Sequence, residues 1–181
     1  ITVDGKVSAI LIVEYSDPIE ISIANSRLHF SKIIVNVLAD AKKKILYEER
    51  LYKFAYFDET TKLANKSMLI KRLDQIINDR KGAEKIAVLD VELENFRNII
   101  DTFGQSTGEQ IMIESAKILE KLLGKSCNLA RTGEGAFIII LPTEKNVNQI
   151  EAFAKKVLDS FSNPISTGTD VDALFVVISI G

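Results

Sequence analysis

Apolar residues recur every three or four positions over the N-terminal third of the chain, which is the period of an amphipathic helix. Asn25 or Ser26 stands before this stripe, and either side chain can cap a helix N-terminus. We therefore predict one helix from there to about Phe54, with a length of about 45 Å at 1.5 Å per residue. Such a helix buries its stripe against a second copy of itself or against its own domain, and the pattern leaves both options open. The stripe comprises Leu28, Ile33, Val37, Leu38, Ala41, Ile45, Leu46 and Leu51.

The segment before this helix predicts a β-hairpin. Residues 1–3 and 7–15 are rich in apolar side chains and flank Asp4-Gly5. Asp-Gly supplies the positive φ angles of a tight hairpin turn. We expect the second of these strands to lead through a loop into the long helix.

From residue 65 onward, helical and strand-like patterns alternate around one central hairpin. The strand over 85–93 is apolar enough to be buried on both faces, and the helix over 106–123 should point Ile111, Ala116, Ile118 and Leu122 inward. This alternation predicts an α/β fold with a mixed central sheet flanked by helices. The predicted helices cover 65–79, 94–103, 106–123 and 146–161, and the strands cover 85–93, 127–131, 136–141 and 173–180, with a turn at 132–135.

Composition narrows the class of protein. The 181 residues carry 23 basic and 25 acidic side chains, a net charge of -2, so we expect no nucleic-acid partner. A single cysteine excludes an internal disulfide.

No apolar run reaches the length of a membrane span, and we expect a cytoplasmic protein. The first residue is not Met and the last residues read as the middle of a strand, so we expect a piece of a longer chain.

Two segments carry the candidate chemistry. Residues 92–97 read E-L-E-N-F-R at the end of a predicted strand, and residues 130–137 read A-R-T-G-E-G-A-F across the central hairpin. Between them stand Gly104 and the pair Gly108-Glu109. Carboxylates at a strand end can hold a divalent cation, and glycines let the backbone approach a ligand closely.

Structural roles explain several of these residues equally well. We expect Phe96 and Phe137 in the core, Glu92 and Glu94 in solvent, and Arg131 paired with a neighbouring carboxylate. Gly104 is expected to end one helix as a C-cap, and Gly108 to lie in the turn that starts the next.

With these segments in order, residues 58–181 resemble the GGDEF family, the diguanylate cyclases and their inactive relatives. Asp58, Thr61, Leu63 and Asn65 match the family's opening D-x-L-T-G-L-x-N-R. Residues 92–101 align with D-x-D-x-F-K-x-I-N-D, and the closing residues 179–181 match a family strand, S-I-G. The family makes cyclic di-GMP from two GTP molecules, each held by one of two facing domains.

The resemblance also shows where this chain departs from the family. Family members hold metal with the first acid of D-x-D and the acidic third letter of GGDEF, and these positions are Glu92 and Gly135 here. The fourth letter, a catalytic acid, is Ala136. The second letter is Glu134, whose carboxylate would lie near the phosphates and repel them. We expect no metal ion, with Glu92 as the remaining weak candidate ligand.

Guanine recognition is also altered. The family's base-binding Asn and Asp fall on Ile100 and Glu109, and an unpaired base group costs about 1–3 kcal/mol. The family's product site, R-x-x-D, falls on residues 124–127, which keep neither key residue. The resemblance therefore implies a vestigial nucleotide site and no catalytic residues. Its members are Glu92, Asn95, Phe96, Arg97, Glu109, Gly133, Glu134 and Gly135.

The N-terminal part more loosely resembles the end of a GAF domain, and a PAS-type hairpin would look similar. We divide the chain into a sensor-domain hairpin at 1–24, a connecting helix at 25–56 that pairs with a second copy, and a degenerate GGDEF domain at 57–181. The helix is expected to form a homodimer and to relay a signal from the sensor. A downstream EAL domain is a candidate partner, because such a phosphodiesterase commonly follows GGDEF domains.

Three functions follow as expectations. The first is an inactive regulatory or dimerisation module of bacterial cyclic di-GMP signalling, which needs no cofactor. The second is a module that binds GTP without turnover and controls an EAL phosphodiesterase. The third is an atypical cyclase that uses Glu92 and Glu134 for metal, and only the last two would bind GTP, with Mg²⁺.

Overall fold

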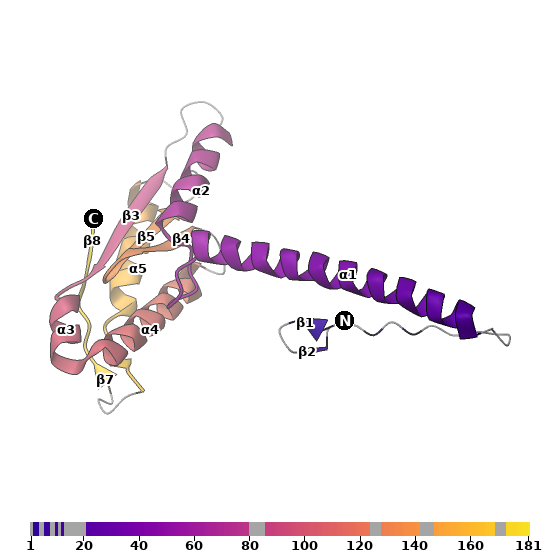
Figure 1. Ribbon diagram of the computed structural model, residues 1–181. Coiled ribbons are helices and arrows are strands. Elements are labelled where there is room, and N and C mark those ends of the chain that lie inside the picture. Colours follow the sequence, from indigo (N-terminus) through magenta and orange to yellow (C-terminus); the bar gives the residue numbers. More distant parts are fainter. Residues whose placement is uncertain are drawn as a thin grey trace. The chain divides into compact units, whose positions relative to one another are not determined.

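A computed structural model describes residues 2–3, 6–7, 10, 12, 21–79, 86–123, 128–141, 147–168 and 173–181. The chain forms two compact units, residues 1–53 and 54–181, and each is described by itself. Figure 1 gives the order of the elements along the chain.

The first unit opens with a short hairpin. Strand β1, Thr2–Val3, pairs antiparallel with β2, Lys6–Val7, which confirms the predicted hairpin. The Asp4-Gly5 turn predicted between them lies outside the described residues. The prediction of a strand over residues 7–15 is wrong in length, because β2 ends at Val7 and residues 10 and 12 are not in a strand. The other residues of that span lie outside the described part.

Helix α1, Ile21–Tyr56, is the long helix predicted from the apolar stripe. It starts before Asn25 and Ser26, so neither can be its N-cap, and the predicted start was wrong. Residues 21–24 read I-S-I-A and contain no Gly or Pro that would stop the helix. Six of the larger apolar side chains of the stripe are exposed in this unit, with fractions of 47–62% at Leu28, Ile33, Val37, Leu38, Ile45 and Leu51, and Leu46 is half-buried.

The second unit is built on a four-stranded sheet in the order β4-β5-β3-β8. Its strands are β3 (Ala87–Leu93), β4 (Leu129–Gly133), β5 (Ala136–Leu141) and β8 (Ile178–Ile180), and the three pairs are antiparallel. A parallel bridge from Ala64 to Ala130 continues the pairing beyond β4. The α/β class with flanking helices is confirmed.

Strand β3 is buried on one face only. Leu89, Val91 and Leu93 are buried, whereas Val88, Asp90 and Glu92 are exposed. The prediction of burial on both faces was therefore wrong. An antiparallel sheet can leave one face in solvent, and helix α2 (Lys66–Asp79) packs mainly over β4 and β5 on that side.

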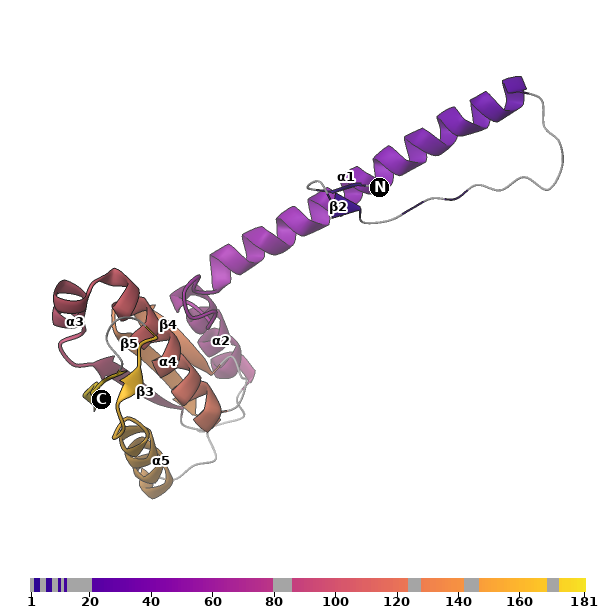
Figure 2. The same cartoon turned by 90° about the horizontal axis from the view of Figure 1, so that it is seen from below.

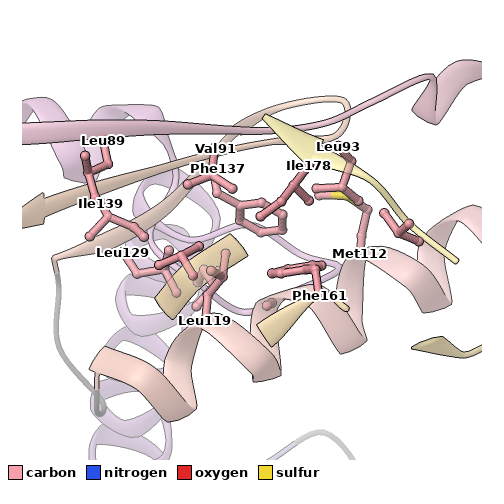
Figure 3. Close-up of a cluster of buried hydrophobic side chains, with 14 of the residues drawn as sticks. Leu89, Val91, Leu93, Met112, Leu119, Leu129, Phe137, Ile139, Phe161 and Ile178 are labelled. Carbon is pink, nitrogen blue, oxygen red and sulfur yellow. The ribbon is translucent and has the colours of Figure 1, made fainter. Parts of the chain in front are cut away.

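Two helices cover the other face and form the main core (Figure 3). They are α4, Gln105–Leu123, and α5, Val147–Ser160. The side chains that fill this core come from four strands, both helices and the segments that follow them. Those labelled in the figure are Leu89, Val91, Leu93, Met112, Leu119, Leu129, Phe137, Ile139, Phe161 and Ile178.

Helix α4 buries a different set of residues from the predicted one. Ile111 and Ala116 are buried as expected, and Ile118 packs partly against the core. Leu122 is 37% exposed, and the prediction that it points inward was wrong. Met112 and Leu119 take the inward positions instead, because the buried stripe follows positions 108, 111, 112, 115, 116 and 119.

Helix α3, Phe96–Phe103, precedes α4 and lies beside its first turns (Figure 2). Gly104 separates the two helices at φ 87°, which confirms its predicted role as a C-cap. Residues 124–127, which correspond to the family's product site, lie outside the described residues.

The last predicted strand, residues 173–180, is divided in two. β7, Ala173–Leu174, pairs with β6, Ile165–Ser166, and only β8 pairs with β3. A continuous pattern of apolar residues could not show this change of partner.

Candidate functional site

The hairpin of β4 and β5 carries the segment that corresponds to GGDEF. Gly133 pairs with Ala136, and an irregularity in register lies between Arg131 and Gly133. Glu134 and Gly135 form the turn, and Glu134 is exposed. Gly133 and Glu134 are thus at the surface of the hairpin tip.

Gly135 lies in a conformation that favours glycine. Its φ is 72°, it is buried, and its carbonyl accepts a hydrogen bond of 2.8 Å from the backbone N–H of Leu93. A Cβ added here would lie 2.8 Å from Cβ of Phe96 and 3.0 Å from its Cγ. Any side chain at this position therefore requires the hairpin or Phe96 to move.

The end of β3 presents its carboxylates to solvent. Glu92 pairs with Ala136 of β5 and with Ser179 of β8, and both Glu92 and Glu94 are exposed, as expected. Asn95 follows at φ 55° as the N-cap of α3 without a side-chain cap bond, and Arg97 is exposed in the first turn of α3. The backbone N–H of Glu94 donates to the carbonyl of Val177.

Phe96 and Phe137 belong to the core, with exposed fractions of 5% and 0%. This confirms their predicted structural role. Phe96 has a second function in the fold, because its ring and Cβ close the space beside Gly135.

Helices α3 and α4 carry Ile100 and Glu109, the two positions that correspond to the family's guanine-binding residues. Ile100 packs against Gly108, where an added Cβ would lie 2.6 Å from Ile100 Cγ1. Gly108 lies in the first turns of α4. Because it has no side chain, α3 and α4 can approach each other closely here. Glu109 is exposed and accepts a hydrogen bond of 3.0 Å from Gln105 Nε2.

The positions with which the family holds metal keep one acid of two. Gly135 offers no side-chain oxygen, Ala136 at the neighbouring catalytic position offers a methyl group, and Glu92 is the acid that remains. Proteins bind Mg²⁺ through one or two carboxylates beside the substrate phosphates. Within the described residues, no group of three or more His, Cys, Asp or Glu could hold a metal ion.

Arg131 pairs with Asp58, which confirms the predicted carboxylate partner. Arg131 Nη1 donates to both oxygens of Asp58 at 3.1 Å, and the two side chains are 18% and 21% exposed. Burial raises the pKa of Asp58, but hydrogen bonds from Thr61 and from Arg131 outweigh it, so the pKa lies below its ordinary value.

A cavity of about 350 Å³ lies beside this ion pair. Of the predicted site residues, only Gly133 lines it. Sequence reasoning missed this cavity, although its lining includes Asp58 and Asn65, two of the residues that match the D-x-L-T-G-L-x-N-R segment. The described residues that line it are Asp58, Asn65, Lys66, Ser67, Arg131, Thr132 and Gly133.

The relatives of this chain in sequence include a signalling protein and a bifunctional enzyme of cyclic di-GMP metabolism. It is 29% identical over 149 residues to the signaling protein YkoW of Bacillus subtilis, covering 80% of this chain and 18% of YkoW. It is 25% identical over 146 residues to MucR of Pseudomonas aeruginosa, a bifunctional diguanylate cyclase/cyclic di-GMP phosphodiesterase. That match covers 80% of this chain and 20% of MucR, so the chain spans about a fifth of these relatives.

Solved structures share the fold. The coiled coil and GGDEF domain of DgcB from Caulobacter crescentus, in complex with c-di-GMP, superposes with a TM-score of 0.72 at 20% identity. The match covers 84% of this chain and 81% of DgcB's. The family described as diguanylate cyclase, GGDEF domain, matches residues 55–181. Through that segment, the chain belongs to the GGDEF family of cyclic di-GMP signalling.

Proposed function

We propose that this GGDEF domain is catalytically inactive and serves as a regulatory and dimerisation module, which relays a signal from an N-terminal GAF-like or PAS-like sensor. The observation that carries the proposal is the contact between Gly135 and Phe96. It leaves no side chain, and no free space for one, at the position where the family's metal-binding acid stands.

The chemistry of cyclisation supports this reading. The 3′-hydroxyl of one GTP attacks the α-phosphate of another, and metal ions neutralise the charge that develops on the phosphoryl oxygens. Gly135 and Ala136 stand where the family has two acids, and neither residue has a carboxylate that could hold these metal ions or take part in the reaction. The exposed carboxylate of Glu134 adds repulsion at the hairpin tip.

Helix α1 supports the dimerisation role. In the first unit its large apolar side chains are exposed, for example Leu38 at 49% and Ile45 at 55%. Apolar residues spaced seven apart on a long helix are typical of a coiled-coil seam. The DgcB structure combines a coiled coil with a GGDEF domain, and we propose a homodimer through α1 on the same pattern.

We place this module in the bacterial cytoplasm, where GTP and cyclic di-GMP are found. None of the described helices has both the length and the apolar content to span a bilayer. The near balance of 23 basic and 25 acidic residues favours a protein partner over nucleic acid.

The test is a titration and an assay on the full-length protein that contains this chain. GTP with Mg²⁺ is titrated calorimetrically, and cyclic di-GMP is measured by mass spectrometry after prolonged incubation. We expect no heat of binding at millimolar GTP and no product. Product formation that Glu92→Ala abolishes would refute inactivity and favour the atypical cyclase that uses Glu92 and Glu134.

A set of variants distinguishes two causes of inactivity, the loss of the two family acids and the lack of space beside residue 135. Ala136→Glu and Gly135→Asp restore the two family acids. Phe96→Ala removes the ring carbons Cγ and Cδ1, which would lie 3.0 and 3.2 Å from an added Cβ at residue 135, and keeps Phe96 Cβ at 2.8 Å. We expect the two acids alone to leave the protein without Mg²⁺-dependent GTP binding. Recovery of binding by the acids without Phe96→Ala would show that the packing does not matter.

A second candidate is a module that binds GTP without turnover and controls a downstream EAL-type phosphodiesterase. MucR, which carries both activities by name, favours this arrangement, and Glu109 keeps an exposed carboxylate at the guanine-binding position. Micromolar GTP binding without product would make this candidate the better one.

A further inference from the structure

Asn65 lies between the end of α1 and the start of α2, and it is bonded to both. Its Nδ2 donates to the carbonyl of Ala55 at 2.9 Å, and its backbone N–H donates to the carbonyl of Tyr56 at 3.0 Å. Its Oδ1 accepts the backbone N–H of Met68 at 3.1 Å. One residue thus satisfies carbonyls in the last turn of α1 and caps the N-terminus of α2.

Ala64 continues this connection to the sheet. It is 5% exposed, forms a parallel bridge with Ala130, and its carbonyl accepts the backbone N–H of Arg131 at 2.9 Å. Arg131 Nε in turn donates to the carbonyl of Gly133 at 3.3 Å. A continuous series of hydrogen-bonded residues therefore joins the last turn of α1 to the start of the hairpin turn.

Several further contacts restrict movement along this series. Asp58 holds the Arg131 guanidinium and accepts hydrogen bonds of 2.7 Å from both N–H and Oγ1 of Thr61. The ammonium of Lys71 lies 4.8 Å from the centre of the Tyr56 ring, which ties α2 to the end of α1. Close-packed residues transmit strain to their neighbours, and Ala64, at the centre of the series, is 5% exposed.

We propose that Asn65 is a positioning residue that couples the last turn of α1 mechanically to the β4–β5 hairpin. A displacement of that turn is passed through Ala64 and Arg131 to residues 133–135. This inference deepens the relay role proposed above and rests on it for its biological use. The coupling itself involves neither nucleotide nor metal.

The test measures amide hydrogen exchange by NMR in the full-length protein with Asn65→Asp. The new carboxylate still accepts the Met68 N–H and suits the N-terminus of a helix, but it can no longer donate to Ala55. We expect exchange of the hairpin amides at 131 and 136–138 to rise about fivefold or more, the lower range of coupling between protein sites. Exchange at Ile111 and Met112 in α4 should not change, which excludes general loss of stability.

Gln75→Glu is the matched control, since it adds the same charge to α2 at an exposed position that does not line the cavity beside Arg131. It should leave hairpin exchange as in the wild type. If Asn65→Asp does not fold, Asn65→Ser replaces it, because serine also caps α2 and its side chain is too short to reach Ala55.

Unchanged hairpin exchange in the folded Asn65 variant would overturn the proposal and reduce Asn65 to a local cap. A further check is the double variant with Arg131→Met. If the coupling passes through Arg131, the two effects on exchange overlap and are less than additive, whereas full additivity would contradict the path. Cyclic di-GMP formation by the wild type would refute catalytic inactivity and leave this exchange result unaffected.

Discussion

The carboxylate of Asp58 binds the guanidinium of Arg131 through both of its oxygens at 3.1 Å, although the two residues stand 73 positions apart in the chain. The pair joins the segment that follows α1 to strand β4. It is largely withdrawn from solvent, so we expect it to stabilise the fold more than a surface ion pair does.

Replacing Asp58 by Asn should lower the free energy of unfolding at pH 7 by about 1.5–3 kcal/mol, the usual value for hydrogen bonds to a charged group. The pKa of Asp58 is lowered in the folded protein, so its stabilisation is complete above its unfolded pKa and is lost as the pH falls through the folded value. The difference between wild type and variant should therefore stay constant from pH 7 down to about 4.5 and shrink below about pH 4.

Urea denaturation at a series of pH values measures this difference. Glu59→Gln is the control, because Glu59 is the exposed acid next to Asp58. A difference that disappears already at pH 6, or that persists unchanged at pH 2, would contradict the assignment to the carboxylate of Asp58.

Replacing Gly135 by Ala should destabilise the domain by about 2–4 kcal/mol, because positive φ and a contact with Phe96 both oppose a Cβ. Gly168→Ala is the matched control. Its φ is 58°, and none of the described atoms lies within 4 Å of an added Cβ, so only the conformational cost of about 1 kcal/mol applies. Thermal or urea unfolding measures the loss of stability in each variant. An equal loss in Gly135→Ala and Gly168→Ala would show that the contact between residue 135 and Phe96 is not tight.

Replacing Ser115 by Ala should stabilise the domain by about 1 kcal/mol. Ser115 is fully buried in α4, and its Oγ has no hydrogen-bond partner among the described residues. Ser106→Ala, at an exposed position of the same helix, controls for the higher helix propensity of alanine. Chemical unfolding of both variants measures the difference, and a destabilised Ser115→Ala would indicate a partner for this hydroxyl.

The proposed dimer predicts that Leu38→Glu together with Ile45→Glu halves the mass measured by light scattering. These residues stand seven positions apart on α1 and are exposed in the first unit, so like charges would face each other across a parallel seam. Lys32→Glu, at another exposed position of α1, should leave the dimer intact. A wild-type protein that is monomeric at high concentration would remove the basis for this role.

Most of the elements could be predicted from local patterns, but strand β6 and the division of residues 173–180 into β7 and β8 could not. The long helix, the central hairpin and the Gly104 helix end all follow from the residues within each segment. The start of α1 could not be predicted in this way, because Asn25 and Ser26 are good caps that also tolerate a helix interior.

Which face of each element is buried depended on its neighbours. Strand β3 contains enough apolar residues for two buried faces, yet Val88 is 45% exposed because the described helices cover the sheet unequally on its two sides. Leu122 and Leu119 are equally apolar, and only the placement of α4 on the sheet decides that Leu119 is the buried one.

The family and the loss of two acids follow from the amino-acid sequence alone, because the residues at Gly135 and Ala136 settle which side-chain oxygens exist. Three contacts are seen only in the folded chain: Phe96 fills the space at Gly135, Asp58 pairs with Arg131, and Asn65 joins α1 to α2. Periodicity and motif spacing report contacts within a segment. Contacts between residues distant in sequence arise only when the helices and the sheet pack together.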